Sequence, residues 1–227
     1  IYSMQDTMQY LCENIQGCVL GYTQSDEITL VLVDYQKLTS SAWFDYEIQK
    51  MCSIVASMAT MAFNKAFAKH VRQFKKSVPY YGTTHPLNED DAKYIDVLNV
   101  AIEKGAMFDA RCFNIPKEEV TNCIYWRQLD ATRNSIQMVG QANFSHKELQ
   151  NKSCNQIQDM LMVQKGINWN DLPVYQKRGS CCVKKEFVYD CDGSTSTRSQ
   201  WVVDLEIPIF KGEGREYIDK LVNVGEE

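Results

Sequence analysis

The sequence predicts an α+β protein: an antiparallel sheet with flanking helices, followed by a smaller C-terminal α+β lobe. Apolar residues recur at helical spacing in several stretches, and β-branched and aromatic residues mark a hairpin near the N-terminus. The 227 residues, 44% hydrophobic and 23% charged, have the composition of an ordinary globular protein. This length suits one large domain or a domain with an appended lobe.

Charge and cysteine content limit the partners and the compartment. A formal net charge of −5 gives no global basic field, although a local basic patch can still bind RNA. The nine cysteines form no C-x-x-C pair, which argues against a zinc site and favours reduced, buried thiols. No apolar run of transmembrane length and no signal peptide is visible. We therefore expect a cytoplasmic protein, or a mitochondrial one in a eukaryote.

A β-hairpin with an acidic turn organises the N-terminal half. Residues 17–23 and 28–33 have strand composition, and they follow a helix predicted over residues 2–15. The turn carries Asp26 and Glu27. Neighbouring strand residues point to opposite faces, so one carboxylate can face a cleft while the other turns to the scaffold. Asp26 is placed to hold a hard cation such as Mg²⁺; a merely solvated acidic turn is the alternative.

A long helix and a polar strand face follow the hairpin. Helical spacing predicts a helix over residues 44–69, with Lys50 near its start, and a shorter one over 90–103. Residues 107–115 are predicted to form a strand. In it, Asp109 and Arg111 project from one face, which indicates contact with a charged ligand or, equally, a cross-strand ion pair.

The C-terminal half begins with a helix opened by Pro116 that carries many polar residues in its middle. Capping boxes at Ser145 and Ser153 then predict short helices. Further strands are expected over residues 181–189 and 201–210, and the polar tail over 212–227 is expected to be mobile.

The predicted order is helix, hairpin, long helix, strand and helix. One further strand in front would give βαββαβ, the ferredoxin-like arrangement that polymerase palms share. We therefore expect residues 1–144 to form a palm-like catalytic domain and residues 145–227 a fingers-like lobe.

Three motifs occurring in this order are specific in combination. They are Ser25-Asp26-Glu27 after an aromatic strand, Phe108-Asp109-x-Arg111, and Trp126-Arg127-Gln128-x-Asp130. Together they resemble the histidine-tRNA guanylyltransferase superfamily, whose members add nucleotides to tRNA 5′ ends in the 3′-to-5′ direction. The similarity covers most of residues 2–190.

Further stretches resemble the bacterial-type branch. The eukaryotic enzymes that add one guanylate to histidine tRNA carry a His-Ile-Asn-Asn-Leu-Tyr-Asn signature, whereas residues 132–138 here read Thr-Arg-Asn-Ser-Ile-Gln-Met. Residues 145–149 and 166–171 also look like the bacterial-type guanylyltransferase-like proteins, which are associated with template-dependent repair of truncated tRNA 5′ ends. The single-guanylate enzyme and a non-catalytic RNA-binding relative are the alternatives.

The resemblance implies a site with two Mg²⁺ ions that uses ATP, GTP or other nucleoside triphosphates as substrates. Asp26 would be catalytic and would bind metal together with Glu27. The nucleotide-binding residues would be Ser25, Lys50 and Arg111, and the RNA-binding residues would be Arg133, Asn134, Lys177 and Arg178, the last two contacting RNA or triphosphate.

The sequence departs from the family at its start. The family's first strand ends in an Asp-Gly-Arg motif that supplies a second metal-binding aspartate, and no such motif precedes Tyr2. We therefore expect the native protein to have residues upstream of Ile1 that supply the strand and the aspartate. The resemblance also implies tRNA as partner, no membrane, and a homo-oligomer, by family a tetramer.

Overall fold

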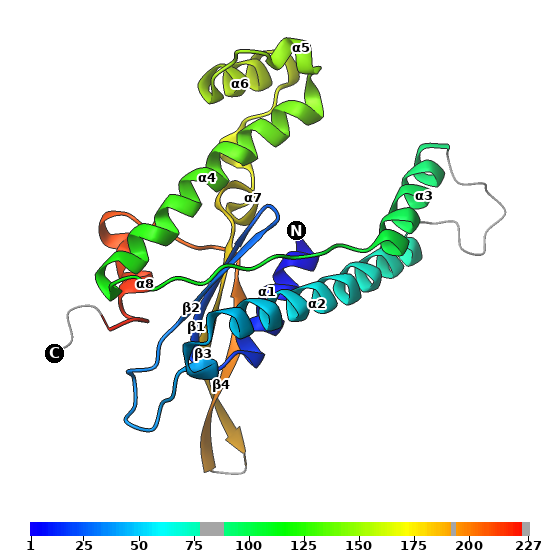
Figure 1. Ribbon diagram of the computed structural model, residues 1–227. Helices are drawn as coiled ribbons and strands as arrows, with labels where there is room; N and C mark the ends of the chain where they lie inside the picture. The colour runs from blue at the N-terminus through cyan, green and yellow to red at the C-terminus, as the bar shows by residue number, and fades with distance from the viewer. Residues whose placement is uncertain (78–88, 192–193, 224–227) are drawn as a thin grey trace.

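The computed structural model describes residues 1–77, 89–191 and 194–223, and it confirms the α+β class (Figure 1). The described strands form one antiparallel sheet in the order β2-β1-β3-β4. They are β1 (Cys18–Gln24), β2 (Glu27–Leu32), β3 (Ser180–Cys191) and β4 (Ser194–Asp204). Because β1 pairs with both β2 and β3, strands from the two ends of the chain share one sheet.

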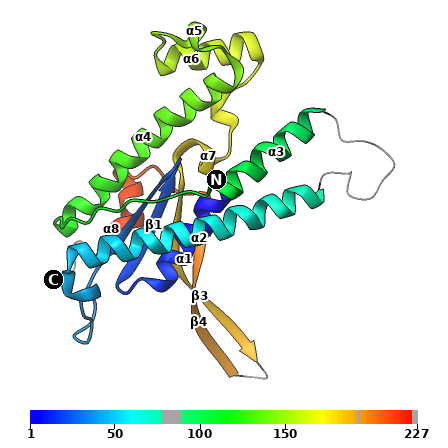
Figure 2. The same ribbon diagram turned by 45° about the vertical axis from the view of Figure 1, so that its right-hand side comes forward.

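Helices cover both faces of this sheet (Figures 1 and 2). On one face lie α1 (Tyr2–Asn14) and α2 (Ile48–Ser77), and on the other lies α4 (Lys117–Asn143). The other described helices are α3 (Glu89–Lys104), α5 (His146–Leu149), α6 (Cys154–Met160), α7 (Val174–Arg178) and α8 (Glu216–Asp219). Single turns of other helix types occupy Trp43–Tyr46, Leu161–Lys165, Trp169–Asp171 and Gly212–Arg215.

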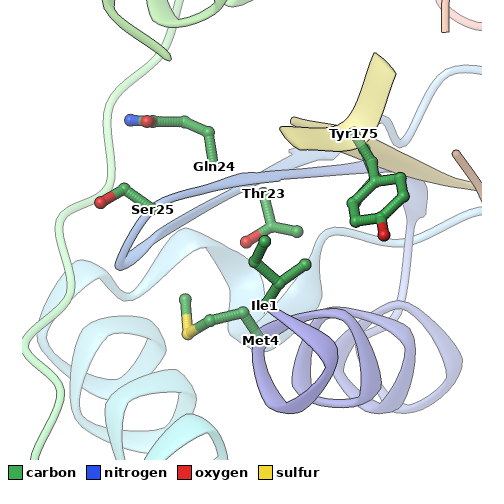
Figure 3. A pocket seen from close by; sticks show the side chains of 7 residues that line it. Ile1, Met4, Thr23, Gln24, Ser25 and Tyr175 are labelled. Atoms are coloured by element: carbon green, nitrogen blue, oxygen red, sulfur yellow. The ribbon is translucent and has the colours of Figure 1, made fainter. Parts of the chain in front are cut away.

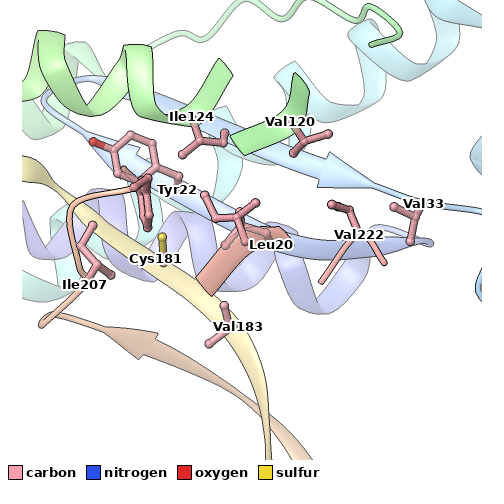
Figure 4. Close-up of a cluster of buried hydrophobic side chains, with 11 residues drawn as sticks. Leu20, Tyr22, Val33, Val120, Ile124, Cys181, Val183, Ile207 and Val222 are labelled. Carbon is pink, nitrogen blue, oxygen red and sulfur yellow. The ribbon is translucent and has the colours of Figure 1, made fainter. Parts of the chain in front are cut away.

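The main core lies between the sheet and α4. Figure 4 shows Val120 and Ile124 of α4 facing Leu20 and Tyr22 of β1. Leu20 and Tyr22 are 0% and 1% exposed, and the Tyr22 ring meets Phe210 edge-on at 6.2 Å. Full burial of one such side chain is worth roughly 1.5–3 kcal/mol, so this layer is a principal source of stability.

The opposite face of β1 is packed just as closely. A Cβ at Gly21 would lie 2.5 Å from the Cys12 sulfur and 2.7 Å from the Met8 Cγ, both on α1. Only glycine therefore allows α1 to approach the strand this closely.

The C-terminal tail belongs to the main core, which corrects the expectation that residues 212–227 are mobile. Ile218 and Val222 are fully buried, and Tyr217 packs on the Phe210 ring at 5.7 Å. Thr121 of α4 donates a hydrogen bond of 2.5 Å to Asp219. Apolar burial and this bond fix the described part of the tail, up to residue 223, against α4.

A second apolar cluster lies at the far end of α4. Its buried members are Ile136, Phe144, Ile157 and Leu161. The capping boxes predicted at Ser145 and Ser153 are both present, and each starts a short helix of this region. Helix α4 ends next to the predicted domain boundary at residue 144, while β3 and β4 join the sheet of β1. The division into two domains stays a prediction.

The strand predicted over residues 107–115 is not paired. The segment is extended and its side chains alternate between half-buried and exposed, as predicted, but no backbone–backbone hydrogen bond joins it to another described residue. It lies instead on α2: Asn64 exchanges two hydrogen bonds with the Ala106 backbone, and Thr60 accepts one from the Phe108 amide. A ladder requires a paired strand, and none of the described strands pairs with this segment.

Two other boundaries differ from prediction. The last strand runs over residues 194–204 rather than 201–210, because residues 207–210 turn back to α4. The long helix starts and ends later than predicted, at Ile48 and Ser77.

By length and composition alone, α2 could cross a membrane. This corrects the expectation that no apolar run reaches transmembrane length, although the core helices of soluble proteins pass the same test.

Gln128 anchors the segment after β4 to α4. Its amide nitrogen donates to the Pro208 carbonyl at 2.8 Å, and its amide oxygen accepts from the Phe210 amide at 3.0 Å. The side chain is 2% exposed. These bonds satisfy backbone groups that lie outside any ladder, so this residue of the Trp-Arg-Gln motif is structural.

Replacing Gln128 by Leu should lower the free energy of unfolding by about 2–4 kcal/mol, because two buried hydrogen bonds are lost and their backbone partners stay unsatisfied. Urea titration followed by circular dichroism measures this. Gln137→Leu, on the exposed surface of the same helix, is the matched control and should change stability by less than about 0.5 kcal/mol. Equal effects for both variants would contradict the anchoring role.

Candidate active site

The tip of the β1–β2 hairpin holds the predicted catalytic residue. Gln24 pairs with Glu27 across the ladder, which leaves Ser25 and Asp26 as a two-residue loop. Both are exposed, and Ser25 has a φ of +51°. A left-handed backbone suits the short hairpin loop but costs a non-glycine residue roughly 1–2 kcal/mol. The tight loop leaves the Asp26 side chain exposed at the tip.

Glu27 turns the other way, as predicted for neighbouring strand residues. Its carboxylate lies 3.4 Å from the Arg127 guanidinium of α4 and accepts a 3.0 Å hydrogen bond from Gln24. The predicted metal-binding role of Glu27 is untested, but its carboxylate is already engaged by the scaffold. Asp26 is the carboxylate of the pair that remains available.

Gln24 is a feature that sequence reasoning missed. It is 6% exposed, and its amide oxygen has no hydrogen-bond partner among the described residues. A buried acceptor without a partner costs roughly 1–3 kcal/mol, which marks a site where another group can enter. Its position two residues after buried Tyr22, on the same strand face, was the signal available in the sequence.

The predicted nucleotide-binding cations lie on α2 and on the segment after α3. Lys50 is exposed in the first turn of α2, and its ammonium lies 4.5 Å from the centroid of the Phe44 ring. Arg111 is 89% exposed and 3.7 Å from the equally exposed Asp109. So exposed an ion pair contributes little to stability, and the ligand contact of this face stays a prediction. Figures 1 and 2 both show the segment between α3 and α4 crossing the hairpin.

The predicted RNA-binding residues fall into two groups. Arg133 and Asn134 lie on α4, where Arg133 forms a 2.8 Å ion pair with Asp130. Lys177 and Arg178 end α7, and the Lys177 ammonium donates to the Asn170 carbonyl at 2.5 Å.

Helix α7 is fixed close to the hairpin. The Tyr22 hydroxyl donates to the Arg178 carbonyl at 2.7 Å, and a Cβ at Gly179 would lie 2.5 Å from the Thr23 carbonyl oxygen. The second basic group is therefore held near the hairpin. On α4, Arg127 contacts the hairpin at Glu27, and Arg133 and Asn134 come six and seven residues later on that helix.

A small cavity lies behind the hairpin tip (Figure 3). It is lined by Ile1, Met4, Thr23, Gln24, Ser25, Tyr175 and Ser180. Its volume of about 30 Å³ suffices for a water molecule but not for a nucleotide. A nucleotide therefore does not fit inside this cavity, and Asp26 itself lies on the exposed surface beside it. In the described part of the chain, no three His, Cys, Asp or Glu side chains are close enough to hold a metal ion.

Comparison with known proteins identifies the family. A family model described as tRNA(His) guanylyltransferase matches residues 1–116. A solved bacterial tRNA(His) guanylyltransferase-like protein in complex with ATP is 40% identical, with a TM-score of 0.74 over 97% of this chain and 77% of that one. The chain belongs to the tRNA(His) guanylyltransferase family. This confirms the resemblance that the three motifs indicated, and the bacterial-type proteins are a strong structural match.

Two further proteins are also similar to this chain. A solved bacterial protein of the same description in complex with GTP is 36% identical, with a TM-score of 0.68 over 98% of this chain and 77% of that one. The tRNA(His) guanylyltransferase of Saccharomyces cerevisiae is 23% identical over 74% of this chain. The chain spans 63% of that yeast protein's length and 57% of the length of another curated relative.

Proposed function

We propose that this protein is a magnesium-dependent nucleotidyltransferase that repairs truncated tRNA by adding nucleotides to its 5′ end, with the opposing strand as template. The observation that carries the proposal is the hairpin tip, where Asp26 is exposed while Glu27 is held by Arg127. In a chain of this family, a free carboxylate on a rigid loop suits the handling of phosphates through a metal ion.

Nucleoside triphosphates are the proposed co-substrates. Solved relatives that are 40% and 36% identical to this chain are complexes with ATP and with GTP. Arg111 and Lys50 supply exposed cations, one with a planar fork for bidentate contact and the other with a point charge. In the proposed reaction the tRNA 5′ phosphate is first activated with ATP, or an existing triphosphate is used. The 3′-hydroxyl of a nucleotide then attacks the activated 5′ phosphate and displaces AMP from the adenylylated end, formed from ATP with release of pyrophosphate, or pyrophosphate from the triphosphate end.

Magnesium is the cofactor that this proposal requires. Mg²⁺ usually binds one or two protein carboxylates together with substrate phosphates and water. Asp26 can supply one such carboxylate, so a single ion between Asp26 and a triphosphate fits the described residues. The neighbouring carboxylate of Glu27 is engaged by Arg127 and Gln24, so the proposed two-ion site would need a further carboxylate. When bound, the ion neutralises charge that develops on the phosphates.

The chain's own residues would bind and orient the substrates. Arg111 and Lys50 would hold the triphosphate, while Lys177 and Arg178 would contact the RNA backbone or triphosphate beside the hairpin. Phosphate contacts position RNA without reading its sequence, so nucleotide choice would fall to base pairing in the acceptor stem. We also propose a homo-oligomer, by family a tetramer, and the exposed Met107 and Phe113 side chains support a further interface.

Two alternatives have specific support. The yeast relative, a tRNA(His) guanylyltransferase, favours single-guanylate addition to histidine tRNA. Because Arg127 engages Glu27, Asp26 is the available carboxylate of the hairpin, which favours a non-catalytic RNA-binding relative. Nucleotide addition in the presence of Mg²⁺ separates an enzyme from a binder, and comparison of several tRNAs separates the two enzymes.

Arg111→Ala should weaken nucleotide use more than tRNA binding. A charge-assisted contact of this kind is worth roughly 1.5–3 kcal/mol, so kcat/KM for the nucleotide should fall about ten- to a hundredfold. Asp109→Ala is the matched control, because it removes the ion pair but keeps the cation. If kcat and KM for the nucleotide are unchanged in Arg111→Ala, the residue serves only the Asp109 pair.

Asp26→Ala should abolish nucleotide addition and leave the fold intact, because it removes a carboxylate from an exposed tip. The expected loss is at least ~10³-fold, the scale on which loss of charge stabilisation in a transition state is felt. Single-turnover addition with Mg²⁺ as sole divalent ion measures the rate. Asp96→Asn, on the exposed face of α3, is the control and should act normally. Near-normal activity of Asp26→Ala would remove the metal-site assignment.

The substrate prediction concerns which nucleotide is added. The protein should extend 5′-truncated tRNAs of several identities with whichever nucleotide pairs with the opposing 3′ strand. Residues 132–138 lack the signature of the histidine-specific enzymes, and a mispaired nucleotide would be misplaced against the activated phosphate, where small displacements are costly in rate.

The assay offers each of the four nucleoside triphosphates to truncated tRNAs whose templating base is varied. Addition that follows the templating base supports repair. Addition of guanylate alone, to histidine tRNA alone and whatever the templating base, would replace repair by the single-guanylate alternative.

A further inference from the structure

Two cysteines that are distant in sequence meet between α2 and the segment after α3. The Cys52 thiol, on α2, donates to the Cys112 sulfur at 3.4 Å, across 60 positions of the chain. Both side chains are half-buried, so small reagents can reach them. Burial raises the pKa of the Cys112 thiol to about 11, so this thiol stays protonated at neutral pH in the reduced protein.

The alignment of residues 106–112 along α2 explains why Cys52 and Cys112 lie side by side. Asn64 holds Ala106 and Thr60 holds Phe108, so the segment runs antiparallel to α2. From residue 108 to 112 an extended chain advances about 13 Å at ~3.3 Å per residue. From residue 60 back to 52 a helix advances about 12 Å at ~1.5 Å per residue. The two anchors therefore bring Cys112 level with Cys52.

The Cys52 and Cys112 sulfurs can approach each other to form a disulfide. A disulfide needs the two sulfurs at ~2.05 Å, which is about 1.4 Å closer than here. Residues 109–115 make no backbone–backbone hydrogen bond to other described residues, so the segment can shift toward α2 without breaking a ladder.

The other cysteines with described side chains are less suited to this reaction. Cys12, Cys18 and Cys182 also lie close together between α1 and the sheet, where Cys12 and Cys182 are buried, and Cys181 is buried in the main core. Cys123 and Cys154 are half-buried, and neither makes a thiol–thiol hydrogen bond with another described cysteine, which makes them useful controls.

We propose that Cys52 and Cys112 are a redox modification site at which a low-molecular-weight disulfide, such as oxidised glutathione, forms an intramolecular disulfide. The Cys52 thiolate attacks oxidised glutathione, giving a mixed disulfide at Cys52 and one reduced glutathione. Cys112 then loses its proton, and its thiolate attacks the Cys52 sulfur of the mixed disulfide and releases the second reduced glutathione. Two protein thiols are oxidised, one glutathione disulfide is reduced, and the two thiol protons pass to the released glutathiones.

The consequence for nucleotide handling rests on the proposed function. Arg111 directly precedes Cys112, and Lys50 lies two residues before Cys52. Closing the disulfide brings the two sulfurs about 1.4 Å closer and ties the two cation-bearing elements together covalently. A displacement of ~1 Å in such elements can cost up to a hundredfold in rate. We expect oxidation to slow nucleotide addition at least about tenfold and reduction with dithiothreitol to restore it.

The decisive experiment maps disulfides in the full chain after incubation with oxidised glutathione. Mass spectrometry of a non-reducing digest should show the Cys52 peptide joined to the Cys112 peptide, in wild type and in the Cys123→Ser and Cys154→Ser controls. Cys52→Ser and Cys112→Ser should each lose the link. Cys112→Ser should keep one glutathione on Cys52, whereas Cys52→Ser should react more slowly, because burial raises the pKa of the remaining Cys112 thiol. Separate glutathione adducts on Cys52 and Cys112 in wild type, or links between other cysteines in their place, would overturn the proposal.

A nucleotide-addition assay on the same samples separates the disulfide proposal from the proposed function. If the link forms but neither the reduced nor the oxidised protein adds nucleotides, the disulfide stands and the proposed function fails. If the reduced protein is active and no link forms, the function stands and the thiol proposal fails. If the link forms without changing the rate, the modification site stands and its effect on nucleotide handling is refuted.

Discussion

The fold depends on the burial of β1 from both sides. Leu20 and Tyr22 enter the core beneath α4, while Gly21 lets α1 press directly on the strand. A strand with two packed faces cannot slip by one residue, because a slip would exchange every side chain between two differently shaped layers. The positions of β2, β3 and α7 all depend on this one strand. Strands β2 and β3 pair with it, and its Tyr22 hydroxyl donates to the Arg178 carbonyl of α7.

Because β1 is fixed from both sides, the hairpin tip can hold conformations that are locally unfavourable. Ser25 has a left-handed backbone, and Gln24 buries an oxygen without a partner, each at a cost of roughly 1–3 kcal/mol. Both features lie within two or three residues of Tyr22, whose burial and hydroxyl bond hold the strand end in place. Such strain is commonly stored at functional sites, where the surrounding structure over-determines the conformation. The exposure of Asp26 is thus supported by the core beneath it.

Local signals in the sequence predicted the elements whose stability is local. The hairpin, α4 and the capping boxes follow from composition and spacing, and the opposed directions of Asp26 and Glu27 follow from strand geometry. Pairing and burial between segments that are distant in sequence could not be predicted from these local signals. The link of Glu27 to Arg127 spans 100 positions, and the helix that buries Ile218 has only four residues, too few for a periodic pattern. Those contacts exist only once the sheet has assembled.

The segment over residues 107–115 shows how side chains can replace a ladder. Its sequence has the alternation of a strand, and its inner face packs on α2, where the Phe108 ring meets Phe63 at 5.5 Å. Without a neighbouring strand, Asn64 and Thr60 satisfy the first backbone groups and set the register. Beyond these anchors only side-chain packing holds the segment, so the part that carries Arg111 is the part with the weakest backbone restraint. A cation placed there can adjust to a ligand, and a covalent link at Cys112 would remove that freedom.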